Sequence, residues 1–494
     1  MTGLDTRTRW LALYVLCLAT LMIVLDTTIV NVALPSIRAD LGFSQTSLAW
    51  VVNAYVLTYA GLLLLGGRLG DLFGQRRLFL LGVALFTLAS LACGVATSQA
   101  MLVVARSVQG VGGAVASAVS LSLTLTLFTD HGERAKAMGI FGFVAAGGGS
   151  IGVLLGGVLT DVLDWHWIFL VNLPIGILVC VLSLRLLPTG TRGTAKLDVG
   201  GAVTVTAALM LAVYAIVNGN DAGWTSAQTL GLLGGSLVLL AAFFAWEKRV
   251  AEPLVPLGLL RLRNVAVSNV TGVLWSASMF ACFFLSALYL QLVLGYDPLH
   301  VGLAFLPGNV IMALFSLGLS AKIVMRFGIR RPLGIGLGLV ALALVLLARA
   351  PVDASFVVDV LPSMLLIGLG AGIAFNPMLL AAMSDVEPQD SGLASGIVNT
   401  AFMMGGALGL AVLASVAASR TDSLRADGHG TASALTGGYH VAFAVGAVFA
   451  ITAVIVATVG LKSRSGERPE LVPDAPDVDD PAVEPRRSKL AANA

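Results

Sequence analysis

Residues 67–77 read Gly-Arg-Leu-Gly-Asp-Leu-Phe-Gly-Gln-Arg-Arg, and they stand between two apolar runs, 48–66 and 78–97. Each run has about the 20 apolar residues that an α-helix needs to cross a bilayer core at 1.5 Å per residue. The quoted segment is therefore expected to be a short turn at one surface of a membrane. Its three glycines permit a tight turn, and its charges keep that turn in water.

The composition of the whole chain agrees with this interpretation. Of 494 residues, 57% are hydrophobic and only 11% are charged, whereas a soluble domain needs roughly 25% charged residues. This excludes an ordinary soluble enzyme, and a net charge of +2 gives no sign of a nucleic-acid binder. Uncharged stretches of spanning length are apolar on every face, which predicts helices and not the alternating strands of a barrel. There are fourteen of them: 10–33, 48–66, 78–97, 101–126, 137–160, 166–187, 199–218, 228–246, 266–292, 300–321, 333–350, 356–380, 395–418 and 439–461.

Lysine and arginine counts in the loops predict the orientation. With the N-terminus in the cytoplasm, 24 of these residues fall on the cytoplasmic side and four on the other side, as the positive-inside rule requires. Both termini are then cytoplasmic. The proline-rich, acidic stretch 462–494 is expected to be a disordered cytoplasmic tail.

A second copy of the end of the 67–77 segment indicates an internal repeat. Phe73-Gly74-Gln75-Arg76-Arg77 is matched by Phe327-Gly328-Ile329-Arg330-Arg331 in an equivalent cytoplasmic loop. Two related bundles are the usual build of secondary transporters. The predicted division is an N-terminal six-helix bundle (1–190), two inserted helices with their linkers (191–262), a C-terminal six-helix bundle (263–461) and the tail (462–494).

Asp26 and Arg106 are the two ionisable residues that lie clearly inside predicted spans. A charge at mid-span costs at least about 2.5–3.5 kcal/mol, so it suggests a function by default. Counting from the outer ends of their helices places Asp26 about 13 Å deep and Arg106 about 9 Å deep, which allows them to pair. Burial and a nearby arginine act in opposite directions on a carboxyl group, as a proton carrier needs. The alternative is a static structural ion pair.

Two further patterns each allow a structural and a functional interpretation. Gly148, Gly152 and Gly156 form a stripe at every fourth residue, with Gly157 beside it. Such a stripe permits close helix packing, and it can also serve as a sliding surface. The 67–77 turn is either a solvated positive-inside turn or a latch that forms ion pairs in one conformation only.

The motifs together resemble the major facilitator superfamily and, within it, the fourteen-helix drug:proton antiporter family. The resemblance covers about residues 10–461. It is carried by the 67–77 turn and by four further stretches: 25–35 (LDTTIVNVALP), 106–114 (RSVQGVGGA), 165–176 (WHWIFLVNLPIG) and 391–409.

This resemblance implies a proton-coupled exporter of lipophilic or cationic drugs, antibiotics or a toxic metabolite, driven by the proton gradient without a bound cofactor. It implies proton coupling for Asp26 and Arg106. It also implies conformational gating by residues of the turn, namely Gly67, Arg68, Asp71, Gly74, Arg76 and Arg77. One departure is Val153, where the helix 5 antiporter motif normally carries proline after the glycine.

Other classes are weighed against this one. A major-facilitator uptake symporter or facilitator for a small nutrient is the alternative, since helix composition does not encode the direction of transport. A membrane enzyme would need a constellation that the chain lacks: its histidines and cysteines show no metal-ligand or catalytic spacing. A sensor would need a folded soluble domain. We expect a monomer in a bacterial cytoplasmic membrane, with a small substrate, protons and lipid as its partners.

Substrate identity is not encoded in these patterns. A cavity between the bundles would be lined by polar and bulky residues at mid-span, each of which is equally compatible with burial between helices: Asn31, Asn53, Gln109, Trp275, Gln291, Asn376 and Met403.

Overall fold

The computed structural model describes residues 5–128, 130–188, 198–250, 253, 255, 257–315, 319–383, 386 and 391–462. Within these ranges the chain is helical and contains no β-strand. The all-α fold class expected from uniformly apolar runs is therefore confirmed. Residues 463–494 of the predicted tail lie outside the described residues.

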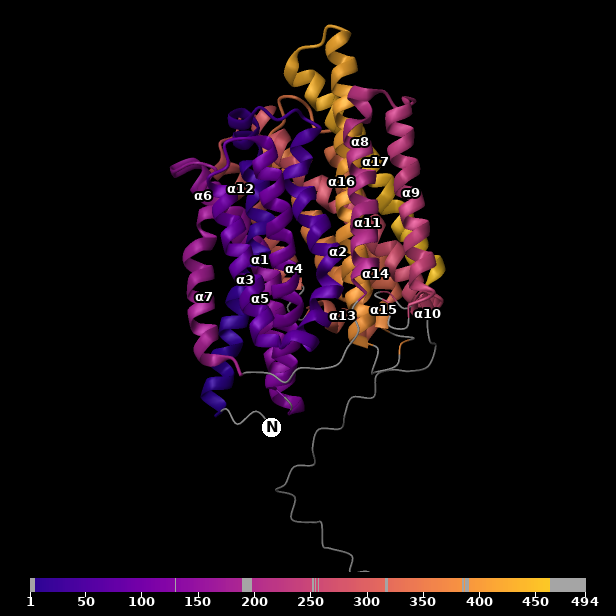
Figure 1. The fold of residues 1–494 in the computed structure, drawn as a ribbon. Coiled ribbons are helices and arrows are strands. Elements are labelled where there is room, and N and C mark those ends of the chain that lie inside the picture. Colours follow the sequence, from indigo (N-terminus) through magenta and orange to yellow (C-terminus); the bar gives the residue numbers. More distant parts are fainter. Residues whose placement is uncertain are drawn as a thin grey trace, which may run out of the picture. The chain divides into compact units, whose positions relative to one another are not determined.

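The first half contains the helices of the predicted N-terminal bundle (Figure 1). They are α1 (Thr6–Leu41), the short 3-10 helix η1 (Ser47–Ala49), α2 (Trp50–Phe73), α3 (Gln75–Gly94), α4 (Gln99–Leu127), α5 (His131–Val162), α6 (Trp167–Leu170) and α7 (Asn172–Leu186).

The inserted helices α8 (Val199–Ala222) and α9 (Ala227–Glu247) come next, followed by the second half. It consists of α10 (Leu257–Leu260), α11 (Arg263–Leu292), α12 (Pro298–Leu314), α13 (Ser320–Phe327), α14 (Arg330–Leu347), the π-helix η3 (Phe356–Val360), α15 (Leu361–Met383), α16 (Ser391–Ala426) and α17 (Thr431–Gly460).

Among the described residues, eleven helices are long and apolar enough to cross a membrane by length and composition. Three further apolar helical segments are shorter: Ser47–Leu63, Ile151–Val162 and Pro298–Leu314. They fall within the expected spans 48–66, 137–160 and 300–321. The chain is therefore a multi-pass membrane protein, while the number fourteen stays a prediction.

Helix boundaries differ from expectation mainly at polar ends. α1 continues beyond 10–33 to Leu41, where Gly42 has a φ of 70° and donates its N–H to the Arg38 carbonyl. α16 likewise extends beyond 395–418 at both ends. The expected boundaries followed the apolar runs, but a helix continues into water wherever its polar side chains can be solvated. A glycine in the left-handed region ends it more reliably than a charge does.

The 67–77 segment is less of a loop than expected. α2 runs to Phe73, so residues 67–73 are helical. The turn is made by Gly74, whose φ of 91° suits only glycine well, and α3 starts at Gln75. The repeat copy behaves alike: α13 ends at Phe327 and Gly328 has a φ of 75°.

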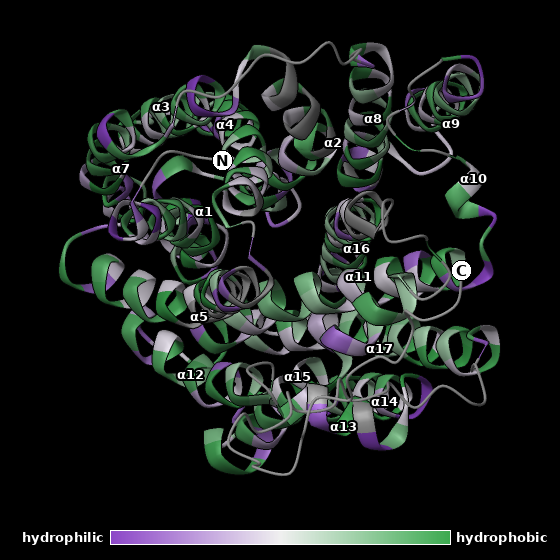
Figure 2. Ribbon diagram, turned by 90° about the horizontal axis from the view of Figure 1, so that it is seen from below, coloured by the Kyte–Doolittle hydropathy of each residue, from purple (hydrophilic) through white to green (hydrophobic). Residues whose placement is uncertain are grey.

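Helix packing repeats between the halves. α1 packs on α5 as α11 packs on α16, and α3 packs on α4 as α14 packs on α15. The contacts between the halves are also related by the repeat: α5 contacts α12, and α2, the equivalent of α12, contacts α16, the equivalent of α5. Seen along the helices, α5 and α12 lie on one side, and α2 and α16 lie on another (Figure 2). This is the packing expected of a duplicated bundle.

The inserted helices attach beside α2 and α16. α8 contacts both of these helices, whereas α9 packs mainly on α8 (Figure 2). Asn220 of α8 donates to the Ser415 carbonyl of α16 across 2.8 Å. The insertion therefore borders the contact that α2 and α16 make between the halves.

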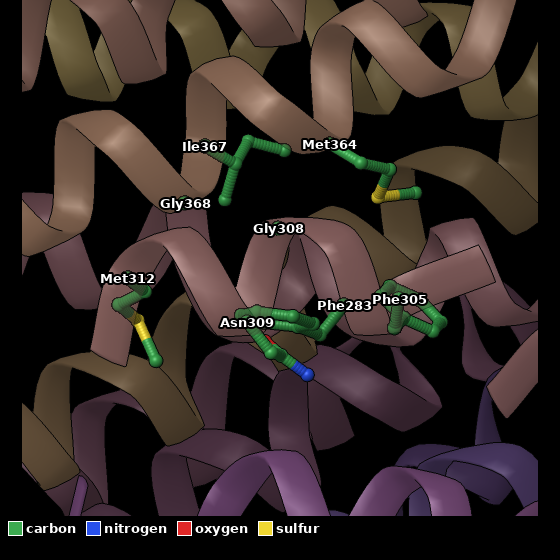
Figure 3. A pocket seen from close by; sticks show the side chains of 8 residues that line it. All are labelled: Phe283, Phe305, Gly308, Asn309, Met312, Met364, Ile367 and Gly368. Atoms are coloured by element: carbon green, nitrogen blue, oxygen red, sulfur yellow. The ribbon is translucent and has the colours of Figure 1, made fainter. Parts of the chain in front are cut away.

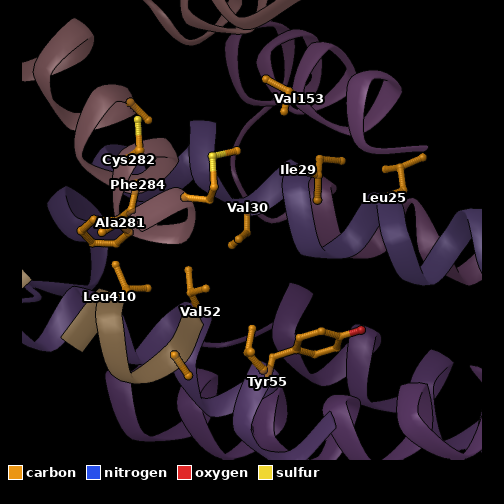
Figure 4. Packing of buried hydrophobic residues seen from close by; sticks show 14 of the residues in the cluster. Leu25, Ile29, Val30, Val52, Tyr55, Val153, Ala281, Cys282, Phe284 and Leu410 are labelled. Atoms are coloured by element: carbon orange, nitrogen blue, oxygen red, sulfur yellow. The ribbon is translucent and has the colours of Figure 1, made fainter. Parts of the chain in front are cut away.

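One buried apolar cluster extends through both halves. Figure 4 shows a part of it, where Val30 of α1 and Val52 of α2 lie near Cys282 of α11 and Leu410 of α16. The four residues are almost fully buried. The halves thus share a continuous core in this conformation.

Candidate functional site

Asp26 of α1 and Arg106 of α4 touch inside the N-terminal half. Arg106 Nη1 donates to Asp26 Oδ2 across 2.5 Å, and neither side chain has exposed surface. Helix rise alone placed them at similar depth, and the structure brings them into contact. Separating such a pair would leave two unpaired charges in a low-dielectric medium. The contact therefore strongly favours a conformation in which α1 and α4 stay together.

Neutral amides complete the ring around the Asp26 carboxylate. Gln109 Nε2 donates to Oδ1 across 2.7 Å, and Asn172 Nδ2 donates to the same oxygen across 3.0 Å. Both amides also reach Ser90 Oγ, at 2.7 and 3.4 Å. Since Ser90 lies on α3, Gln109 on α4 and Asn172 on α7, the cluster links four helices of one bundle.

The Arg106 guanidinium is held on several sides. Its Nε donates to the Val51 carbonyl across 2.9 Å, and Nη1 also donates to Gln109 Oε1 across 2.6 Å. Its carbon Cζ lies 4.4 Å from the centre of the Tyr55 ring and 5.5 Å from that of Phe169. Cation–π contacts gain strength when the cation is desolvated, so the aromatic walls stabilise this buried charge.

The chemistry available to this cluster is narrow. Arginine stays protonated, so Asp26 is the group of the cluster that can gain and lose a proton under ordinary conditions. While α1 and α4 are together, three donor groups act on the carboxylate. A movement that separates these helices would take the guanidinium away from the Asp26 carboxylate.

The turn residues predicted to gate are partly described. Arg76 donates through Nη2 to the Leu184 carbonyl near the end of α7, an arrangement that satisfies an unpaired carbonyl of a helix C-terminus. Arg77 is exposed. The side chains of Arg68 and Asp71 lie outside the described residues, as does any interaction they make.

The glycine stripe of α5 lies directly on α1. A methyl group added to Gly152 would lie 2.9 Å from the Leu25 carbonyl oxygen, and one added to Gly156 would lie 2.6 Å from the Ile29 carbonyl oxygen. Gly148 meets Leu21 and Val24 at 3.1 Å in the same way. The stripe therefore allows the backbones of α1 and α5 to approach closely in this conformation.

Gly157 faces the other half instead. A methyl group there would lie 2.6 Å from the Pro298 carbonyl oxygen of α12. In return, a methyl group added to Gly302 of α12 would lie 3.0 Å from the Val153 carbonyl oxygen. The residue that stands where the family pattern has proline is therefore part of the contact between halves.

The residues predicted to line a substrate cavity occupy different environments. Gln109 belongs to the charged cluster described above. Gln291 of α11 donates to the Val32 carbonyl of α1 across 2.8 Å, so it links the two halves near their predicted outer ends.

The other predicted wall residues are buried to different degrees. Asn31 donates to a carbonyl of its own helix at 3.3 Å. Asn53 is fully buried, and its amide has no hydrogen-bond partner among the described residues. Trp275 is 2% exposed, while Asn376 and Met403 are partly buried.

The C-terminal counterpart of the charged cluster is apolar. Gly110 of α4 packs against the Tyr55 carbonyl of α2. Gly368 of α15 packs in the same way against the Gly308 carbonyl of α12. This correspondence makes Met364 the counterpart of Arg106. A cavity of about 10 Å³, enough for about one water, lies at this place (Figure 3). Its wall consists of Phe283, Phe305, Gly308, Asn309, Met312, Met364, Ile367 and Gly368.

Sequence reasoning missed Asn172 and Ser90 and gave Gln109 another role. For Gln109 a signal was available, because it lies three residues after Arg106 on the same helix face. Asn172 offers a weaker signal: a polar residue at the start of α7, just after the break in the expected span 166–187. Ser90 offers none, since serines are common inside membrane helices.

Comparison with known proteins gives a consistent result. The family model described as Major Facilitator Superfamily matches residues 16–410. The chain is 41% identical to the puromycin resistance protein of Streptomyces alboniger, over 92% of this chain and 91% of that one. It is 39% identical to the cephamycin export protein of Amycolatopsis lactamdurans, over 92% and 93% of the two chains.

Solved structures agree at the level of the fold. A mutant of the nucleoside transporter NupG superposes with a TM-score of 0.66 at 13% identity, covering 92% of this chain and all of the other. A bacterial homologue of the human lysosomal transporter Spinster, inward-facing and occupied, also gives 0.66, at 15% identity and 92% and 97% coverage.

Proposed function

The chain belongs to the major facilitator superfamily, and from this membership we propose that it exports antibiotics or other lipophilic or cationic compounds by proton antiport. It does so as a monomer in the cytoplasmic membrane, without a bound cofactor. The two related bundles alternate between conformations open to either side.

The export direction and the substrate class are supported by the relatives. The names of two proteins that share about nine-tenths of their length with this chain describe puromycin resistance and cephamycin export. A third, from Mycobacterium tuberculosis, is named a multidrug resistance protein and is 37% identical over 83% of this chain and 76% of its own length. All three names describe removal or resistance, and none describes uptake.

Proton coupling is supported by the buried contact between Asp26 and Arg106, and this is the observation that carries the proposal. In the conformation described, the arginine and two amides donate hydrogen bonds to the carboxylate. We propose that the outward-opening movement separates α1 from α4 and allows Asp26 to bind a proton. Return of the proton to the cytoplasm then restores the contact.

The alternating movement requires the outer contacts to break. Gly157 against Pro298 and Gln291 against Val32 hold the halves together at their predicted outer ends. These contacts support a conformation closed to the outside. In the same proposal, the 67–77 segment acts as the gate at the cytoplasmic ends, with Arg76 holding the end of α7.

The test measures accumulation of a panel of antibiotics and lipophilic cations in an efflux-deficient bacterial host. Cells express the wild type, Asp26→Asn, Asp40→Asn or an empty vector, with and without a protonophore. Asp40 is the matched control, because it lies on the same helix, is exposed, and bonds only Trp165 among the described residues.

We expect wild-type and Asp40→Asn cells to accumulate less of at least one compound, and the protonophore to erase this difference. Asp26→Asn cells should match the vector although the protein is present in the membrane. Greater accumulation in wild-type cells would mean uptake. Full export by Asp26→Asn would overturn the coupling role of Asp26.

A further inference from the structure

Four aromatic rings from three helices of the C-terminal half form a continuous cluster. Trp275 of α11 lies 6.2 Å from Phe375 of α15 and 5.4 Å from Phe402 of α16, measured between ring centres. Phe280 lies 6.3 Å from Phe402. The interplanar angles are 61–73°, within the edge-to-face range that aromatic pairs prefer. We call these four residues the aromatic cluster.

The cluster is open on one side. Phe375 is 40% exposed, whereas Trp275 beneath it is 2% exposed. Phe375 lies three residues before Met378, whose sulfur would be 3.5 Å from a methyl group on Gly272 of α11. This face of α15 therefore points toward α11, and the Phe375 ring lies on it.

The indole of Trp275 has an unmet hydrogen bond. Its Nε1 is buried and finds no acceptor among the described residues. A buried tryptophan N–H usually has a partner, and an unpaired donor costs free energy. The two phenylalanine rings packed on this indole are hydrocarbon and offer no oxygen or nitrogen acceptor. An acceptor brought by another molecule would satisfy the donor.

We infer that the aromatic cluster binds the planar aromatic part of a transported compound, with a hydrogen-bond acceptor at the edge of that part directed at Trp275 Nε1. The compound's ring packs against Phe375, and turning the partly exposed Phe375 side chain uncovers the indole. Side chains with exposed surface change rotamer rapidly. This inference rests on the proposed export function and adds the chemical class of the substrate and the half that recognises it.

The test compares two cations of the same charge. Daunorubicin has a planar fused ring system with carbonyl acceptors at its edge, whereas tetraphenylphosphonium has four rings out of one plane and no acceptor. Binding of each is measured on the purified full-length chain in lipid nanodiscs by equilibrium dialysis. The variants are Phe375→Leu, which removes the exposed ring, and Trp275→Phe, which keeps a ring but removes the N–H.

Phe244→Leu is the matched control, because Phe244 is 44% exposed but lies on α9, away from the cluster. We expect each cluster variant to raise the Kd for daunorubicin about three- to tenfold, the loss of one ring contact or one hydrogen bond. The Kd for tetraphenylphosphonium should change less than about twofold in the same variants. Phe244→Leu should change neither. Thermal unfolding of each variant checks that it is folded.

Three results would overturn the inference. They are no daunorubicin binding by the wild type, unchanged binding in the folded Phe375→Leu variant, and equal weakening of both cations. The panel assay above keeps the two proposals apart. Protonophore-sensitive export of any compound upholds the export function even if the cluster variants bind normally, whereas absence of all export rejects that function and this inference together.

Discussion

The two halves share a packing scheme but not a chemistry. In the N-terminal half, Arg106 and Gln109 of α4 surround a carboxylate. In the C-terminal half, the equivalent positions on α15 are Met364 and Ile367, beside a cavity of about 10 Å³. The glycine contacts that set the spacing of the helices are nevertheless repeated. Packing therefore sets the fold in both halves, while the buried charged pair of the N-terminal half has apolar side chains at the equivalent positions of α15.

The largest effect is expected when Arg106 is replaced by methionine, the residue that the C-terminal half has at the equivalent position 364. Arg106→Met leaves Asp26 buried without its cation, and removing one partner of a buried pair costs about 3–5 kcal/mol. We expect a large loss of thermal stability in detergent and no gradient-driven export. Unfolding can be followed with a thiol-reactive dye, since Cys17, Cys93 and Cys282 are buried.

The double variant Asp26→Leu/Arg106→Met separates stability from coupling. Replacing both charges by apolar side chains is commonly neutral for stability, so unfolding should return close to the wild-type temperature while export stays absent. Met364→Leu, the matched change in the other half, should alter neither property. Restored export in the double variant would show that the pair is structural only.

The sequence was sufficient for the features that depend on one helix at a time. Apolar runs predicted the helices, the copy of Phe73-Gly74 at Phe327-Gly328 predicted the repeat, and helix rise predicted the depth of Asp26 and Arg106. The fold class follows from these observations. The four-part domain division stays a prediction, because none of the contacts decides its residue boundaries.

The sequence could not predict how each helix is rotated about its axis or which side chains of other helices it meets. A single sequence does not say which helix a neutral side chain faces, so Asn172 and Ser90 could not be joined to Asp26. For the same reason, the residues that were expected to line one cavity lie in several different environments. Helix ends were also uncertain, because the charged residues of 67–73 continue α2 instead of ending it. Polar side chains solvated at a helix end cost little, so charge is a poor boundary marker.

A second test asks whether packing really is equivalent in the two halves. Gly156→Ala places a methyl group 2.6 Å from the Ile29 carbonyl oxygen of the facing helix, and Gly409→Ala places one still closer to the Cα of Ala277. Overpacking of this kind costs about 1–3 kcal/mol, so both variants should unfold at lower temperature, Gly409→Ala by at least as much as Gly156→Ala.

Gly338→Ala is the control for the glycine variants. It lies within α14, and a methyl group there meets nothing within 4 Å. Alanine favours a helix over glycine by up to about 1 kcal/mol, so this variant should be unchanged or slightly more stable. If Gly409→Ala were tolerated while Gly156→Ala were not, the repeat would be one of topology without equivalent packing.

The smallest expected difference between the halves concerns the polar side chains that precede α12 and its counterpart α2. Asp297 Oδ1 accepts the His300 N–H at the start of α12 across 2.8 Å, and in the turn before η1 and α2 Ser44 Oγ accepts the Ser47 N–H across 3.0 Å. The hydrogen bond from the His300 backbone lowers the pKa of Asp297 below its usual 3.8. The C-terminal half thus has a titratable cap where the N-terminal half has a neutral one.

The sign of the pH effect follows from that lowered pKa. The charged cap contributes its full stability above about pH 4 and loses it as the pH falls through the lower pKa of the folded chain. A helix cap contributes about 0.5–2 kcal/mol, and the exposure of Asp297 places it at the low end. Between pH 5 and pH 3 we expect the unfolding temperature of the wild type to fall further than that of Asp297→Asn, which keeps an uncharged cap. Ser44→Ala should lower the unfolding temperature by the same amount at both pH values, so a pH-dependent effect of Ser44→Ala would contradict the assignment of the titrating cap to one half.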